Sequence, residues 1–321
     1  MGSHELATTG PSTLPTGRQF EIRHGDQRAV AVELGAALRA YDLAGVPILA
    51  GFAEDEPIRG GRGAVLLPWP NRIEDGRYEF AGESHQLAID DVADGNAIHG
   101  LVRWVPWSPV AHESTAVSLR TTVFPRPGYP FTLAARVRYQ LADDGLTVTT
   151  AVRNVGRQAA PVGLGHHPYV ALPGRRVDDS TLQVPASSWF PTGRRRLPEP
   201  ATDISDGPFD FRVARAVGPT VLNGTYFDLE RDADGRAWVR VDETVLWQDA
   251  AYPFVLVFSG EDLPDSSEHR RSLAVEPMTC PPNAFRSGIG LTVLRPGETL
   301  RARWGIVPAA RRTAGPAADE S

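Results

Sequence analysis

The chain of 321 residues contains no lysine, since all 33 of its Lys and Arg positions are arginine. This absence excludes chemistry that depends on a lysine amine, such as a Schiff base or the lysine of a Walker-type phosphate loop. The single cysteine, Cys280, excludes an intrachain disulfide and a structural zinc site of the Cys₄ or Cys₂His₂ kind. No partner His is identifiable for a Cys280 nucleophile. The composition is compatible with a reducing compartment.

Long apolar runs are also missing. The best candidate, residues 253–258, is interrupted by Ser259 and Gly260, well short of the roughly 20 residues that cross a bilayer. The first twenty residues lack the basic start and apolar core of a secretory signal. We therefore expect no membrane partner and a cytoplasmic location.

An excess of positive charge is absent as well. The formal net charge is -6, whereas nucleic-acid-binding proteins concentrate positive charge to displace counterions from phosphates. The only basic run, Arg194-Arg195-Arg196, lies in a stretch that contains Pro and Gly, and a solvated loop is favoured over a phosphate-binding patch. No nucleic-acid partner is expected.

The spacing of apolar residues has the two-residue period of β-strands. Apolar and polar residues alternate over 136–141 and again over 146–149, and Asp143-Asp144-Gly145 between them predicts a hairpin. Residues 253–258 are continuously apolar, and so are the three residues that follow Ser272 in 272–275, which is typical of strands buried on both faces. These patterns indicate a fold dominated by antiparallel strands.

The organisation of the chain is that of a single domain. Residues 28–43 fit short strands better than a helix, and no segment shows a sustained 3.6-residue apolar stripe. No low-complexity linker divides the chain. We predict an all-β protein with one large β-sandwich over residues 18–308, a disordered lead-in at 1–17 and a disordered tail at 309–321.

Two polar segments precede or follow Asp-Gly turn signals. Asn71 and Arg72 lie between apolar residues shortly before Asp75-Gly76. This pair either offers a fork of donors to hydroxyl oxygens or pairs with a carboxylate and closes the turn. His99 follows the turn at Asp94-Gly95, where a lone loop histidine is either structural or functional. Both segments are candidate binding elements.

The pattern His166-His167-Pro168-Tyr169 points to a proton-transfer group. Adjacent side chains on a strand point to opposite faces, so only one of the two histidines faces any given pocket. His167 and Tyr169 are two residues apart, which places both rings on one face. A histidine titrates near pH 6.5, and this suits a proton donor beside a sugar-sized ligand.

Glu276 ends an apolar strand and is followed by Pro277. A carboxylate in that position is costly unless it is paired or functional, so Glu276 is a candidate functional residue. A metal site built from His99, His167 and Glu276 lacks metal-ligand spacing. We therefore predict no metal and no cofactor.

These segments, in this order, resemble the aldose 1-epimerase (mutarotase) family over roughly residues 20–307. The resemblance rests on Asn71-Arg72-Ile73, Gly76, Tyr78, His99-Gly100, His167-Pro168-Tyr169, Glu276-Pro277, Asn283-Ala284-Phe285, Pro296-Gly297-Glu298 and Trp304-Gly305. It implies a galactose-mutarotase-like β-sandwich (supersandwich) with a sugar cleft open on one sheet.

The resemblance also implies an activity and residue roles. The protein is expected to be an isomerase that interconverts the α and β anomers of a free aldohexose or related sugar, with the sugar as its small-molecule partner. Glu276 matches the general base that takes the anomeric hydroxyl proton, and His167 matches the general acid for the ring oxygen. Asn71, Arg72 and His99 match positions that bind sugar hydroxyls, and Tyr169 belongs to the same motif as His167. The proton donors and acceptors exchange roles on the return, so no cofactor is implied.

Two positions depart from the family pattern and affect the distal end of the pocket. Asn223 stands where the family has an Asp that binds distal hydroxyls, and Asp228 is the nearest carboxylate that substitutes for it. Leu256 stands where a Gln is common. Asn223 and Asp228 are both predicted to contact the sugar.

Two alternatives stay open at the level of sequence. A 1-epimerase for hexose 6-phosphate or another acidic sugar needs an arginine cluster at the pocket, for which Arg72, Arg103 and Arg175-Arg176 are available. A non-catalytic sugar-binding or sensor protein on the same fold is the alternative from another class. The sequence specifies neither the sugar nor the oligomeric state.

Overall fold

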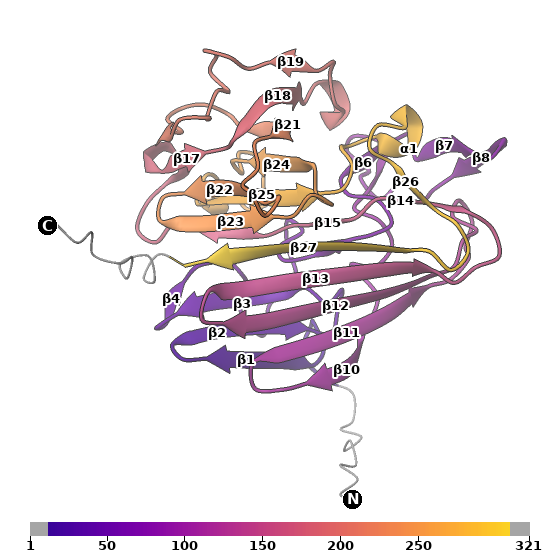
Figure 1. Ribbon diagram of the computed structural model, residues 1–321, viewed down its shortest axis with the longest axis horizontal. Helices are drawn as coiled ribbons and strands as arrows, with labels where there is room; N and C mark the ends of the chain where they lie inside the picture. Colours follow the sequence, from indigo (N-terminus) through magenta and orange to yellow (C-terminus); the bar gives the residue numbers. More distant parts are fainter. Residues whose placement is uncertain (1–11, 309–321) are drawn as a thin grey trace, which may run out of the picture.

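The two-residue hydrophobic period corresponds to a structure made almost entirely of strands. A computed structural model of the chain describes residues 12–308 (Figure 1). Within that range, helical structure is limited to α1 (Ala284–Ser287) and three short 3₁₀ turns, η1 (Val177–Asp179), η2 (Arg194–Arg196) and η3 (Ser266–Glu268). The predicted all-β class is confirmed.

Two large antiparallel sheets form the body of the molecule. The first has nine strands, in the spatial order β10 (Ser108–His112), β11 (Ala116–Val123), β12 (Leu133–Ala142), β13 (Gly145–Asn154), β27 (Thr299–Val307), β23 (Thr244–Gln248), β22 (Ala237–Val241), β17 (Thr181–Gln183) and β20 (Arg215–Ala216). The second has eight strands, in the order β19 (Thr202–Asp203), β18 (Ala186–Pro191), β21 (Asn223–Leu229), β24 (Phe254–Phe258), β25 (Ser272–Met278), β15 (Gly165–His166) and β5 (Val65–Leu66), with β16 (Tyr169–Ala171) also paired to β25.

Smaller sheets complete the fold of the described residues. One has four strands, β1 (Gln19–His24), β2 (Gln27–Val32), β3 (Leu38–Leu43) and β4 (Val46–Pro47), and it packs against β11 and β12. Three are two-stranded: β6 (Arg72–Glu74) with β9 (Asn96–Ile98), β7 (Arg77–Phe80) with β8 (Glu83–Gln86), and β14 (Ala160–Val162) with β26 (Thr292–Leu294). Figure 1 shows β1 to β4 near one end of the molecule and β18, β21 and β24 near the other.

The hairpin of β12 and β13 shows why these residues form a sandwich. Val137, Tyr139 and Leu141 are buried, while their neighbours Arg136 and Gln140 are exposed. The turn falls at Asp143 and Asp144, where the sequence predicts it. Alternate burial of this kind gives the nine-stranded sheet one apolar face, which packs into the core.

The adjacent histidines separate the two faces of the eight-stranded sheet. His166 points into the sandwich, where its Nε2 lies 2.9 Å from the Thr150 hydroxyl of β13 and its ring lies 5.4 Å from Trp304 of β27. His167 therefore faces the other side of the sheet. Every residue of β25 is buried, so this strand is covered on both faces, as its apolar sequence predicts.

Part of the predicted lead-in belongs to the fold. Residues 14–17 form a turn, Thr16 is fully buried, and its carbonyl accepts a hydrogen bond from the Leu34 amide. The expectation of disorder is therefore wrong for this part, because these residues complete hydrogen bonds beside β1. Residues 1–11 and the predicted tail at 309–321 lie outside the described residues. Among the described residues, no helix combines the length and apolar character needed to span a membrane.

Candidate active site

A cavity of about 270 Å³ lies over the face of the eight-stranded sheet that His167 shares. Its floor comes from neighbouring strands: Asn223 of β21, Leu256 and Phe258 of β24, and Glu276 of β25. Leu256 is paired with Glu276 and Asn223 with Phe258 across the ladder, so these side chains project to the same side. The volume is near the lower end of the range for small-molecule pockets.

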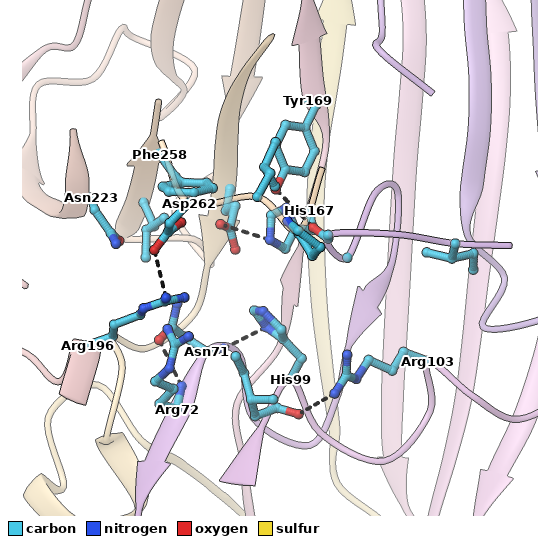
Figure 2. Close-up of a pocket in the computed structure, with 18 of the residues that line it drawn as sticks. Asn71, Arg72, His99, Arg103, His167, Tyr169, Arg196, Asn223, Phe258 and Asp262 are labelled. Carbon is cyan, nitrogen blue, oxygen red and sulfur yellow. Dashed lines mark hydrogen bonds and ion pairs between the residues drawn. The ribbon is translucent and has the colours of Figure 1, made fainter. Parts of the chain in front are cut away.

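The opposite wall is built from the β6–β9 pair and from loops (Figure 2). Besides the four floor residues, the cavity is lined by Ile58, Gly60, Gly61, Asn71, Arg72, Ile98, His99, Arg103, Trp104, His167, Tyr169, Arg196, Asp262, Leu263 and Pro264. Segments far apart in the sequence therefore converge on a single site.

Glu276 is the buried acid of this cavity. Only 1% of the residue is exposed, and its Oε1 lies 3.3 Å from Nε2 of His167. Its Oε2 is buried and has no hydrogen-bond partner among the described residues. Burial raises the pKa of Glu276 to about 8, against a smaller lowering by the charge of Arg72. Glu276 therefore holds a proton at neutral pH.

His167 is held by aromatic stacking. Its ring lies parallel to that of Tyr169, with 5.0 Å between centroids and 11° between planes. The Tyr169 hydroxyl donates to the Gly60 carbonyl at 2.9 Å, and the guanidinium carbon of Arg62 lies 4.9 Å from the centre of the Tyr169 ring. Burial lowers the pKa of His167 to about 3, so the imidazole is neutral at pH 7.

The Glu276–His167 pair thus contains one proton at neutral pH. This proton resides on the carboxyl group, and 3.3 Å separates that group from the imidazole nitrogen. Transfer across this gap converts a neutral pair into a carboxylate and an imidazolium, that is, one base and one acid. Among residues 12–308, no group of three His, Cys, Asp or Glu side chains is arranged to hold a metal ion.

His99 presents one hydrogen-bond donor to the cavity. Its backbone amide donates to the backbone carbonyl of Asn71 at 2.8 Å, and its ring Nδ1 accepts from the backbone amide of Asn71 at 3.2 Å. Burial holds the pKa of His99 well below its ordinary value, so the ring is neutral. Because Nδ1 accepts, the single ring proton is on Nε2. Figure 2 shows this ring beneath His167, and the two centroids are 5.2 Å apart.

Arg72 is anchored before any ligand binds. Its Nε donates to Asp91 at 2.6 Å, and its amide donates to the Asn71 side chain at 2.9 Å. The backbone amide of Asn283 donates to the Arg72 carbonyl at 2.6 Å, and the side-chain oxygen of Asn283 accepts from the backbone amide of Glu74 at 3.1 Å. The motif at Asn283 therefore braces β6 and positions the arginine, without lining the cavity itself.

The structure brings most of the predicted residues together. Glu276, His167, Asn71, Arg72, His99, Tyr169 and Asn223 all line the cavity. The prediction for Asp228 is wrong: its carboxylate accepts a hydrogen bond from Ser188 at 2.8 Å in an exposed position. Asp228 is five residues from Asn223, and an odd separation along a strand sends side chains to opposite faces.

The interpretation of Arg194–Arg196 as a solvated loop is also wrong in part. Arg194 is exposed, but Arg196 lines the cavity. The side chain of Arg195 binds the loop before β9, with Nε donating to the Asp94 carbonyl at 2.7 Å. Solvation is predicted from the local composition. A run of arginines does not indicate which distant loop it will contact, so the contacts of Arg195 and Arg196 could not be foreseen from it.

Several lining residues have no signal in the sequence pattern. Trp104, Asp262 and the pair Gly60-Gly61 lie on irregular loops, and the two-residue period that identifies strand faces does not extend to them. The positive φ of Gly61, 72°, is a conformation that favours glycine. The Gly60-Gly61 dipeptide therefore weakly indicates a turn with positive φ and gives no indication of a ligand site.

Gly61 packs directly under the acid–base pair, which leads to a prediction. A Cβ at this position would lie 2.9 Å from Cδ2 of His167, so Gly61→Ala is expected to displace the imidazole and lower kcat about tenfold or more. Gly82→Ala is the matched control, because Gly82 has a similar φ of 83° but no atom within 4 Å of the added Cβ. Rates of anomer exchange, the activity expected from the family resemblance, are compared between the two variants together with their melting temperatures. Equal rates in both variants would contradict the packing role of Gly61.

Comparison with known proteins agrees with this geometry. Residues 18–306 match the sequence model of the aldose 1-epimerase family. The uncharacterized protein YihR of Escherichia coli (strain K12) is 34% identical over 290 residues, which are 89% of this chain and 92% of YihR.

Solved structures show the same fold at lower identity. The GalM/aldose epimerase homologue from C. elegans has a TM-score of 0.79 at 18% identity, covering 91% of this chain and 99% of that one. The galactose 1-epimerase from Lactobacillus acidophilus NCFM has a TM-score of 0.71 at 20% identity, covering 89% and 93%. The family match spans nearly all of the described residues. The chain belongs to the aldose 1-epimerase family.

Proposed function

We propose that the protein is an aldose 1-epimerase, a mutarotase that interconverts the α and β anomers of a free aldohexose or related sugar. The observation that carries this proposal is the buried Glu276–His167 pair, which faces the cavity with a separation of 3.3 Å and an unpartnered carboxyl oxygen. Anomerisation needs one acid and one base on either side of the anomeric centre. The pair supplies both with a single shared proton.

The proposed cycle starts with transfer of the Glu276 proton to His167. The carboxylate then takes the proton from the anomeric hydroxyl while the imidazolium protonates the ring oxygen, and the bond between C1 and the ring oxygen breaks. Rotation about the C1–C2 bond exposes the other carbonyl face. Ring closure reverses these proton transfers and returns Glu276 and His167 to their starting protonation states, so the cycle consumes no co-reactant.

The opposite wall supports charge development on the sugar oxygens. The Nε2–H of His99 and the guanidinium of Arg72 are fixed donors, because His99 is held by a hydrogen bond from Asn71 and Arg72 by one to Asp91. Donors that are oriented in advance stabilise a developing negative charge without reorganising. We assign them to oxygens near the reacting carbon.

The acid–base pair also favours catalysis over simple sugar binding. A buried carboxyl oxygen without a hydrogen bond is costly, so a protein that only binds sugar gains nothing by retaining it. The direct test follows the optical rotation of freshly dissolved α-glucose and α-galactose. The enzyme is expected to accelerate the change above the spontaneous rate. Spontaneous rates across a broad panel of sugars would contradict the proposal.

The pKa values of the pair predict the pH dependence. Between about pH 5 and 7 the pair keeps its one proton, so kcat/KM is expected to be constant. Above about pH 8 the carboxyl of Glu276 ionises, the pair loses its proton, and kcat/KM falls about tenfold per unit. NMR exchange rates corrected for the spontaneous reaction measure this profile. A rate that rises through pH 8 would show that the proton is not required.

A further inference from the structure

The loop of η2 has an unusual backbone that places one arginine in the cavity. Arg195 and Arg196 have φ values of 58° and 54°, so two consecutive non-glycine residues are left-handed. Such residues are strained and persist only where the surroundings hold them. This strain, beside a candidate active site, points to a role for the side chains that it directs.

Arg195 is the tether of this loop. Its guanidinium donates to the carbonyls of Asp94 and Gly95 at 2.7 and 2.8 Å, and to the side chains of Asp75 and Asn96 at 2.7 and 3.1 Å. The Asn96 side chain donates back to the Arg195 carbonyl at 3.0 Å. These contacts bind η2 to the loop before β9 and hold the next residue, Arg196, in place.

Arg196 is directed toward the cavity beside Arg72. Figure 2 shows the two guanidinium groups on the same side of the pocket, below Asn223. The Arg196 Nε lies 3.2 Å from Asp94, and Asp94 is also 3.9 Å from Arg72. The Arg196 terminal NH2 pairs with Asp262 at 2.8 Å. Each guanidinium has five N–H donors, so these contacts leave donors of both arginines for a ligand.

The residues that line the cavity have an excess of positive groups. Arg72, Arg103 and Arg196 line it, whereas Asp262 and the deeply buried Glu276 are its only carboxyl-bearing residues. The Nε of Arg103 is buried without a hydrogen-bond partner. The carboxylates of Asp90, Asp91 and Asp94 pair with the arginines but do not line the cavity. A ligand therefore meets mainly guanidinium groups, which suit an oxyanion.

We propose that Arg196, whose guanidinium lies beside that of Arg72, binds an anionic substituent of the sugar, so that the substrate class is an aldose carrying a phosphate, sulfonate or carboxylate group. This inference rests on the proposed function and specifies its substrate. Asp262, whose side chain is 40% exposed, forms an ion pair with Arg196. The oxyanion displaces this carboxylate from Arg196, and the hydrogen bonds of Arg195 hold the Arg196 guanidinium in position to bind the oxyanion.

Calorimetric binding tests the proposal separately from turnover. The probes are glucose, glucose 6-phosphate, 6-deoxy-6-sulfoglucose and glucuronate, which distinguish the three oxyanions. At least one acidic sugar is expected to bind wild type about tenfold or more tightly than glucose, and Arg196→Gln is expected to weaken that sugar about tenfold to a hundredfold. Glucose affinity in Arg196→Gln should change less than about threefold, and the exposed Arg194→Gln is the matched control.

A second variant keeps the test decisive if Arg196→Gln unfolds. Asp262→Asn removes the carboxylate that competes for Arg196, so it is expected to tighten binding of the acidic sugar severalfold and to change the affinity for glucose much less. Equal affinity for glucose and every acidic sugar, or equal losses for both kinds in Arg196→Gln, would overturn the inference. Anomer exchange is measured on the same samples: acceleration of neutral sugars only contradicts this inference alone, whereas no acceleration of any sugar contradicts the proposed function.

Discussion

Glu276→Gln is expected to lower the catalysed rate of anomer exchange about a thousandfold, within the range typical of a lost acid–base group. The amide has nearly the shape of the carboxyl group but neither accepts nor releases a proton at neutral pH. The wild-type carboxyl lies 3.3 Å from His167, so replacing it removes the proton that the pair transfers. Exchange measured by NMR, with the spontaneous rate subtracted, gives the effect. Glu79→Gln on the exposed side of β7 is the control and should retain full activity.

The same variant should be more stable than wild type, and this separates lost chemistry from lost folding. Burial raises the pKa of Glu276 from 4.5 to about 8, so between these values the folded chain holds a proton that the unfolded chain has released. Rising pH therefore lowers the free energy of unfolding through this window. Glu276→Gln removes that effect and should gain about 2 to 4 kcal/mol at pH 8 but little at pH 4.5.

Urea unfolding at several pH values measures this difference. The gain should grow from pH 4.5 to 8 and stay constant above. A gain that is independent of pH, together with retained activity, would show that Glu276 is neither buried as an acid nor part of the reaction.

His167→Ala is the second change with a large expected effect, a loss of about a hundredfold to a thousandfold in kcat. It removes the imidazole that lies 3.3 Å from the Glu276 carboxyl, and it also removes the ring that stacks on Tyr169. Added imidazole is expected to restore part of the rate, since the deleted side chain leaves space beside the carboxyl. A purely structural histidine would show no such rescue.

The neighbouring histidine supplies the matched control. His166 points into the sandwich and contacts Thr150 and Trp304, so His166→Ala should lower stability while changing kcat less than about threefold. The opposite result, full activity in His167→Ala and loss in His166→Ala, would reverse the assignment of the two faces.

The strand-borne part of the site is predictable because strands have a simple period. The two-residue spacing of His167 and Tyr169 places their rings together, and they stack in the structure. The apolar sequence around Glu276 indicates its burial, which the structure confirms. The same rule explains the error at Asp228, whose odd separation from Asn223 puts it on the other face.

The loop-borne part is not predictable from local pattern. Arg196 reaches the cavity through a left-handed backbone held by contacts with residues about one hundred positions earlier in the chain. Asp262 and Trp104 likewise depend on how irregular segments meet over the sheet. Arg175 is one of the arginines that the sequence makes available for a cluster at the pocket. In the structure it pairs instead with Asp242, at 3.3 Å. Long-range packing, which no short window of sequence contains, decides which arginines line the cavity.

The central claim is that the cavity catalyses exchange between anomers through the Glu276–His167 pair. Magnetisation-transfer NMR between the anomeric protons of α and β sugars tests it most directly, with neutral, phosphorylated, sulfonated and uronic-acid aldoses as a panel. Exchange well above the spontaneous rate is expected for at least one sugar with wild type, and exchange at the spontaneous rate is expected with Glu276→Gln. Equal exchange rates with wild type, with Glu276→Gln and without protein for every sugar would contradict it.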